Sequence, residues 1–155
     1  MKLSERFKPA GIRINSSSTN KRELIIELVD SLVKAYELEA SHQSILDSVI
    51  SREDKMSTGI GCGLAVPHAK VSCIDNMYMV AATCASGVDF EAIDKEPVYL
   101  MILLISPENT IGPHLRALSS VSRIMADAKV RTDLVSSETA EEFIQVLEDA
   151  EERFG

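Results

Sequence analysis

The chain has 155 residues, enough for one domain with a sizeable apolar core and too few for two ordinary domains. Its 16 Lys and Arg side chains against 24 Asp and Glu side chains give a formal net charge of −8 at pH 7, which argues against a general binder of nucleic acid or anionic membranes. Apolar residues make up 45% and charged residues 26% of the chain, a composition that excludes disordered and fibrous classes.

The sequence has no pattern typical of a membrane span, a secretory signal or a disulfide framework. The longest strongly apolar run, Val98 to Ile105, is too short to cross a bilayer, and the N-terminal residues lack the apolar core of a signal peptide. Cys62, Cys73 and Cys84 include no C-x-x-C pair, which favours free thiols in a reducing compartment over a thiolate zinc site. We therefore expect a cytoplasmic protein without direct membrane insertion.

The N-terminal residues differ in character from the rest of the chain. Residues 1–10 are polar and basic and contain Pro9, which predicts a flexible N-terminal arm followed by one domain over residues 11–155. Ile12 to Asn15 is a candidate for a short first strand.

Two helices are predicted next. Asn20 can cap the first helix, Glu23 stands at the capping-box position, and apolar residues recur at helical spacing from Leu24 to Tyr36. The second helix is predicted to start near Ser41 and to end near Glu53.

Glycines and apolar runs mark the middle of the chain as a set of strands. Three glycines from Gly59 to Gly63 exclude a stable helix, and Leu64 to Val66 reads as a short strand that Pro67 ends. Met77 to Cys84 and Val98 to Ile105 are apolar runs of strand length, which predicts strands covered on both faces.

Two further helices are predicted in the last third. One spans about Gly112 to Ala128, and the other is capped by Thr139 with Glu142 three residues later. Because helices precede and follow the buried strands, we predict an α/β fold: a single domain with a small mixed β-sheet sandwiched between helices.

Two features of the middle segment are candidates for chemistry. The amides around Gly59, Gly61 and Gly63 could bind an anion, although a simple tight connection explains the same glycines. Pro67 fixes its own φ angle and removes a donor, so His68 leaves the strand in a rigid frame, as a nucleophile or a ligand requires.

The other candidates each have a simpler explanation. His42 lies in a polar helix start, where we expect it in solvent, and His114 begins a helix, where its imidazole can equally lie in water. Arg52 near a helix C-terminus can simply offset the helix dipole. With no H-E-x-x-H or H-x-H pattern and no thiolate pair, a zinc site and a metal-dependent hydrolase are disfavoured.

Several of these residues recur together in a known family. Arg52-Glu53, the stretch Ser57-Thr-Gly-Ile-Gly-x-Gly-Leu-Ala-Val-Pro-His68, the stretch Gly87-Val-Asp-Phe-x-Ala-Ile-Asp and His114-Leu follow each other in the order seen there. In this respect residues 12 to 150 resemble enzyme IIA domains of the fructose/mannitol type of the phosphoenolpyruvate:sugar phosphotransferase system, including the nitrogen-regulatory members. The family often has Asn where Cys62 stands, and polar residues where Ile111 to Pro113 precede His114.

The resemblance implies a phosphocarrier with His68 as the phosphorylated histidine, His114 as a second active-site histidine and Arg52 as the active-site arginine. A neutral imidazole has a nitrogen lone pair that can attack a phosphoryl group without a separate base. The phosphoryl group carries roughly −1.5 to −2 charge, which Arg52, His114, the amides of Gly59 to Gly63 and the Thr58 hydroxyl are candidates to offset. Such transfer depends on positioning and charge, so no metal or cofactor is expected.

Two functions of this kind remain open. In the first, His68 accepts its phosphoryl group from an HPr-like phosphocarrier protein and passes it to a IIB partner for sugar uptake. In the second, the phosphorylation state of His68 controls binding to regulatory target proteins, as in the nitrogen-regulatory members; the stretch from Phe90 to Asp94 looks closer to that branch. We also predict that Cys62 is the most reactive thiol and that its alkylation blocks phosphorylation of His68. The alternative that the sequence leaves open is a Cys62 side chain turned inward as packing, because a residue between two glycines can point either way.

Overall fold

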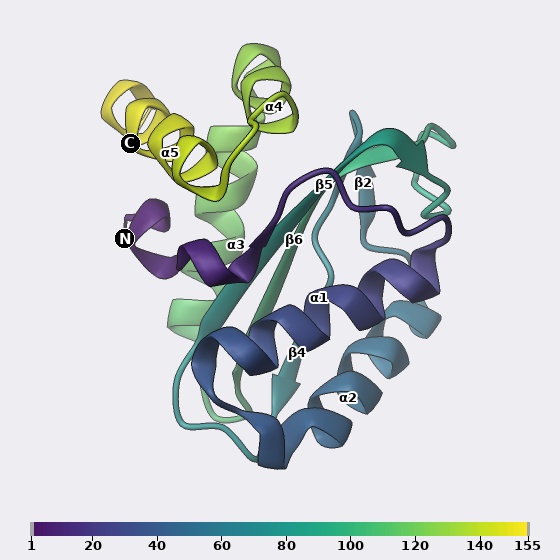
Figure 1. Ribbon diagram of the computed structural model, residues 1–155. Helices are drawn as coiled ribbons and strands as arrows, with labels where there is room; N and C mark the ends of the chain where they lie inside the picture. Colours follow the sequence, from purple (N-terminus) through teal and green to yellow (C-terminus); the bar gives the residue numbers. More distant parts are fainter. Residues whose placement is uncertain (1, 155) are drawn as a thin grey trace.

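The computed structural model describes residues 2–154 and shows a mixed six-stranded sheet between two layers of helices (Figure 1). In chain order the elements are η1 (Leu3–Arg6), η2 (Pro9–Gly11), β1 (Ile12–Arg13), α1 (Lys21–Tyr36), η3 (Glu39–Ser41), α2 (His42–Lys55), β2 (Gly59–Gly61), β3 (Leu64–Ala65), β4 (His68–Val71), β5 (Tyr78–Val88), β6 (Val98–Pro107), α3 (Gly112–Met125), α4 (Ala128–Val135) and α5 (Ala140–Phe154). The predicted α/β fold with a small mixed sheet is confirmed.

Strands β5 and β6 form the antiparallel centre of the sheet. The strand order is β1-β5-β6-β3-β2, and β4 also pairs with β6. Both β3 and β4 run parallel to β6, one after the other, with Leu64 opposite Leu100 and His68 opposite Leu104. The chain from β3 to β4 is therefore an interrupted strand beside β6, and the break contains Pro67, which has no N–H to donate to a ladder.

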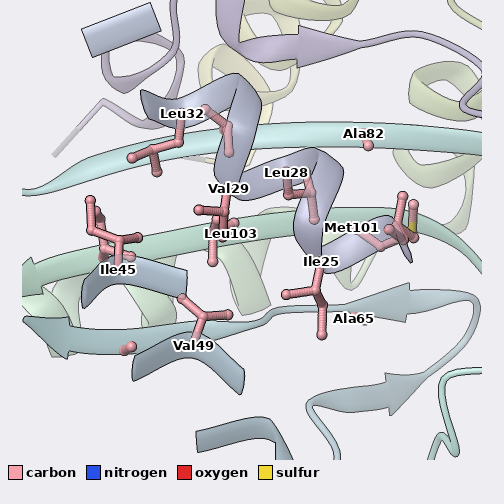
Figure 2. Close-up of a cluster of buried hydrophobic side chains, with 14 of the residues drawn as sticks. Ile25, Leu28, Val29, Leu32, Ile45, Val49, Ala65, Ala82, Met101 and Leu103 are labelled. Atoms are coloured by element: carbon pink, nitrogen blue, oxygen red, sulfur yellow. The ribbon is translucent and has the colours of Figure 1, made fainter. Parts of the chain in front are cut away.

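Side chains of β5 and β6 alternate between two apolar clusters, which explains why both segments read as continuous apolar runs. Val80 and Leu103 face α1 and α2, whereas Met79 and Ile102 face the layer that contains α3, α4 and α5. Figure 2 shows the first cluster, in which α1 and α2 pack on β3, β5 and β6.

The helix boundaries follow the expected capping signals. The Asn20 side chain accepts from the amide of Glu23 at 2.9 Å, and the Thr139 hydroxyl accepts from the amide of Glu142 at 3.1 Å. The predicted helix from Gly112 to Ala128 instead ends at Met125, because Asp127 caps a new helix, α4. Strands β2 and β4 were not predicted.

The expected flexible arm over residues 1–10 is packed against the domain from Leu3 onward. Leu3 is fully buried and Phe7 packs edge-on against Phe143 of α5. The backbone amides of Leu3 and Ser4 both donate to the Glu151 carboxylate. Two apolar side chains in an otherwise polar segment therefore dock it on the last helix. None of the helices within residues 2–154 has the length and apolar composition to span a bilayer.

Candidate functional site

His68 is the first residue of β4 and follows the break at Pro67, whereas the sequence suggested that Pro67 ends the only strand here and that His68 leaves it. Its Nδ1 lies 2.9 Å from the carbonyl oxygen of Val66. A carbonyl can only accept, so Nδ1 must carry the ring hydrogen. In the neutral ring the lone pair therefore belongs to Nε2, which is the nitrogen available for attack on an electrophile.

His114 lies beside His68, near the start of α3. The two ring centroids are 5.6 Å apart with an interplanar angle of 61°. His114 is only 5% exposed, which corrects the alternative that its imidazole lies in water. Burial, followed by the nearby His68 and Lys70, lowers the pKa of His114 from its ordinary value of 6.5, so the ring is neutral at pH 7.

Arg52 reaches the same region from the last turn of α2. Its Nη1 donates to the carbonyl oxygen of Met56 at 2.8 Å, so Arg52 does interact with the C-terminal end of its helix. Arg52 also lines both of the hollows that flank His68. From one position Arg52 can therefore offset the dipole of its helix and also line the hollows beside His68.

The two hollows differ in chemistry. The polar hollow, about 560 Å³, brings together α2, β4 and His114, and its cationic side chains are Arg52, Lys55 and Lys70. The apolar hollow, about 700 Å³, contains His68, Val66 and Leu118 together with the residues of its outer rim. That rim carries three exposed apolar side chains, Met56, Ile60 and Ile93, which are 72%, 51% and 82% exposed.

The glycine segment forms a tight hairpin. The amide of Gly59 donates to the Ser57 hydroxyl at 3.1 Å, and the amide of Cys62 donates to the Asp94 carboxylate at 3.0 Å. Gly59 lines the apolar hollow beside His68, whereas Cys62 and Gly63 line a separate groove formed with Tyr99 and α4. The expected group of free amides from Gly59, Gly61 and Gly63 is not gathered around His68 in this structure.

Cys62 and Cys73 are exposed, whereas Cys84 is buried. The structure corrects the expected placement of Cys62 close to His68. The side chain lies in the groove with Gly63 and Tyr99, so the thiol is not part of either hollow that contains His68.

A buried carboxylate behind the site was missed by sequence reasoning. Glu53, with its side chain 3% exposed, accepts from the hydroxyl and the amide of Thr58 and pairs with Lys21 at 2.8 Å. The hydroxyl hydrogen of Thr58 is therefore used within the protein, and Thr58 joins the hairpin to α2 rather than presenting a free donor. The Arg52-Glu53 pair was noted in the sequence, but helical spacing alone does not reveal that Lys21 lies within reach.

His42 pairs with Asp30 at 2.6 Å on the surface of the α1–α2 layer, away from the two hollows. Within residues 2–154 no group of three or more His, Cys, Asp or Glu side chains converges as a metal site would require.

Comparisons with known proteins identify the family of this arrangement. A family model for the phosphoenolpyruvate-dependent sugar phosphotransferase system, EIIA 2, matches residues 5–150. The chain is 32% identical over 147 residues to the fructose-specific EIIABC component of Bacillus subtilis, covering 95% of this chain but only 23% of that protein. It is 30% identical over 151 residues to a nitrogen regulatory protein of Pseudomonas aeruginosa, covering 97% of each chain.

Solved structures show the same fold. The nitrogen regulatory protein IIA-Ntr from Neisseria meningitidis superposes with a TM-score of 0.86 at 28% identity, covering 94% of this chain and 98% of that chain. Enzyme IIAMTL from Escherichia coli, solved in complex with phosphorylated enzyme IIBMTL, has a TM-score of 0.76 at 19% identity, covering 92% and 97%. The resemblance drawn from the sequence is thus confirmed, and the chain belongs to the EIIA type 2 family of the phosphoenolpyruvate-dependent sugar phosphotransferase system.

Proposed function

We propose that this chain is a phosphohistidine carrier in which Nε2 of His68 accepts a phosphoryl group from an HPr-like phosphocarrier protein and passes it to a IIB partner. The observation that carries the proposal is the hydrogen bond from His68 Nδ1 to the Val66 carbonyl, which leaves the Nε2 lone pair free. The family membership supports the phosphoryl-relay chemistry, and the IIAMTL–IIBMTL complex supports a IIB protein as the acceptor.

The reaction requires no separate base. A bond forms between His68 Nε2 and phosphorus as the bond between phosphorus and the donor's nitrogen breaks, and the Nδ1 hydrogen stays on Nδ1. Arg52 and His114 are the side chains assigned to offset the charge of the moving group. The local cations also matter because the protein as a whole carries a charge of −8, which would otherwise repel a phosphoryl group.

The surroundings of His68 fit a protein donor better than a small molecule. Met56, Ile60 and Ile93 expose apolar surface next to the nucleophile, and contiguous exposed apolar side chains are typical of protein contact sites. A carrier that covers this rim places its phosphohistidine over His68 and excludes water from the transfer. We place the protein in the cytoplasm. We propose residues 11–155 as the carrier domain, with the segment from Leu3 to Ala10 packed against its last helix.

Phosphoryl uptake from labelled phosphoenolpyruvate through the general carrier proteins of a sugar phosphotransferase system tests this function. The wild-type protein is expected to gain one acid-labile phosphoryl group, and His68→Ala is expected to gain none. His42→Ala is the matched control because it removes another imidazole that lies outside both hollows. Equal labelling of the wild-type protein and His68→Ala contradicts the proposal.

A regulatory role is the second candidate. The specific observation is similarity: IIA-Ntr from Neisseria meningitidis superposes with a TM-score of 0.86 at 28% identity, against 0.76 at 19% identity for IIAMTL from Escherichia coli. In this role the phosphoryl group on His68 switches the binding of regulatory target proteins. Rapid transfer from phosphorylated protein to a sugar-specific IIB protein supports transport, whereas a stable phosphoryl group in the presence of IIB supports regulation.

A further inference from the structure

Ser106 lies behind His114 and takes no part in the function described so far. It is in β6, opposite Lys70 of β4, and it is fully buried. Its hydroxyl oxygen is 2.5 Å from Nδ1 of His114. Ser106 and His114 therefore form a buried polar pair within an apolar layer, directly beside the His68 ring.

The direction of this hydrogen bond follows from the number of available partners. Within residues 2–154, the Ser106 hydroxyl has hydrogen-bonding geometry with His114 Nδ1 alone. If Nδ1 donated, the hydroxyl hydrogen would have no acceptor in a buried position, and leaving a buried polar hydrogen unpaired is unfavourable. The hydroxyl therefore donates to Nδ1, and the hydrogen of the neutral His114 ring is on Nε2.

We propose that Ser106 is a positioning residue that holds His114 in the tautomer with its hydrogen on Nε2, so that this nitrogen donates to the phosphoryl group on His68. The inference rests on the proposed function for its consequence in phosphoryl transfer. The two neighbouring rings then have opposite polarity: His68 Nε2 offers a lone pair to phosphorus, and His114 Nε2 offers a hydrogen to a phosphoryl oxygen.

The tautomer matters because His114 is a neutral ring. Burial and the nearby His68 and Lys70 lower its pKa, so it has a single N–H instead of the two of an imidazolium. With that hydrogen on Nδ1, the ring would turn a lone pair toward a phosphoryl oxygen and repel it. One hydroxyl group thus decides whether His114 stabilises or opposes the transferred group.

The ring nitrogens of His114, observed by long-range ¹H–¹⁵N NMR, test the proposal before any variant is made. In the wild-type protein we expect a single neutral tautomer with the hydrogen on Nε2. A hydrogen on Nδ1 in the wild-type spectrum overturns the proposal.

Variants then test the role of the hydroxyl. Ser106→Ala removes the bond that distinguishes the two nitrogens, so both tautomers become populated and single-turnover transfer slows by about tenfold, the size of effect that loss of one hydrogen bond produces. Ser106→Thr keeps a hydroxyl and is expected to restore the Nε2–H signal. Ser120→Ala is the matched control, because Ser120 is a buried serine on the same helix as His114 but outside both hollows.

The outcomes separate this proposal from the function on which it rests. Unchanged tautomer and unchanged transfer rate in Ser106→Ala overturn the role of Ser106. Absence of any phosphoryl uptake by the wild-type protein contradicts the proposed function instead, and the ring spectrum then still decides whether Ser106 sets the tautomer.

Discussion

At the scale of single residues, His68 is fixed by a bond that also determines its reactivity. The Val66 carbonyl, two residues earlier, accepts from Nδ1 and so orients the ring and assigns its lone pair at once. Pro67 stands between the two residues and restricts the backbone that connects donor and acceptor. The Val-Pro-His sequence is therefore a structural unit that holds the His68 ring and leaves Nε2 unbonded to Val66.

Removal of the Arg52 side chain should slow phosphoryl transfer without unfolding the protein. The guanidinium faces both hollows, and its bond to the Met56 carbonyl is exposed to solvent and contributes little to stability. We expect Arg52→Ala to reduce the single-turnover rate by about 10²- to 10³-fold, the usual effect of losing one preorganised donor. Arg123→Ala, on the exposed face of α3, is the control, and an equal rate in both variants contradicts the role of Arg52.

The lowered pKa of His114 predicts a pH dependence of stability with a definite sign. In the unfolded chain His114 takes up a proton near its ordinary pKa of 6.5, whereas the folded protein resists this down to a lower pH. The unfolded state then binds more protons, so the free energy of unfolding falls as the pH drops below 6.5 and levels off at the lowered pKa. Urea unfolding at pH 7.5 and pH 5.5 should show a larger loss for the wild-type protein than for His114→Gln; equal losses contradict this account.

Cys62 has a positive φ angle, a backbone conformation that Gly and Asn adopt more readily than Cys. Cys62 and Gly63 are the two central residues of the hairpin between β2 and β3, with φ angles of 57° and 77°. Positive φ at both positions is typical of a type I′ turn, for which Asn-Gly is strongly preferred. We expect Cys62→Asn to raise the free energy of unfolding by about 1 kcal/mol, with Cys73→Asn as the exposed control. A loss of stability in Cys62→Asn contradicts this explanation of the turn.

At the scale of elements, the Glu53 carboxylate joins α1, α2 and the glycine hairpin. It accepts from Thr58 just before β2 and pairs with Lys21 in the first turn of α1. Because Arg52 precedes Glu53 on α2, this network also fixes the turn of helix that presents Arg52 to the site.

Neutralising Glu53 should therefore cost stability. Glu53→Gln removes the charge that pairs with Lys21 and replaces one acceptor with a donor amide beside Thr58. We expect the free energy of unfolding to fall by about 1–3 kcal/mol, the usual cost of leaving a buried polar group unsatisfied. The adjacent exposed residue gives the control Asp54→Asn, and denaturant midpoints that match between the two variants contradict a structural role for Glu53.

Elements whose pattern lies in their own residues were predicted from the sequence. Elements that depend on pairing with distant segments were not. Helices α1 and α5 have caps and a long apolar period, and β5 and β6 have apolar runs of strand length, so each was predictable from its own residues. Strands β2 and β4 have no such pattern, since their pairing with β3 and β6 is set by distant segments. The start of α4 did have a local signal in Asp127, which caps the amide of Val130.

At the scale of the whole molecule, the fold brings together residues far apart in the chain. Arg52 comes from the helical layer on one face of the sheet, His114 from the layer on the other face, and His68 from the strand between them. The sequence singled out these three residues through the resemblance to a known family. The structure places the rings of His68 and His114 side by side. The burial of His114 and its bond to Ser106 depend on the packing of α3 against β6, which no local pattern encodes.

The central claim, that His68 Nε2 is the phosphoryl acceptor, is tested most directly by ¹⁵N and ³¹P NMR of the phosphorylated protein. The Val66 carbonyl retains the hydrogen on Nδ1, so the account predicts a phosphorus–nitrogen coupling at Nε2 of His68 and an unchanged Nδ1–H signal. Phosphorus bound to Nδ1 of His68, or to any other residue of the chain, would contradict it.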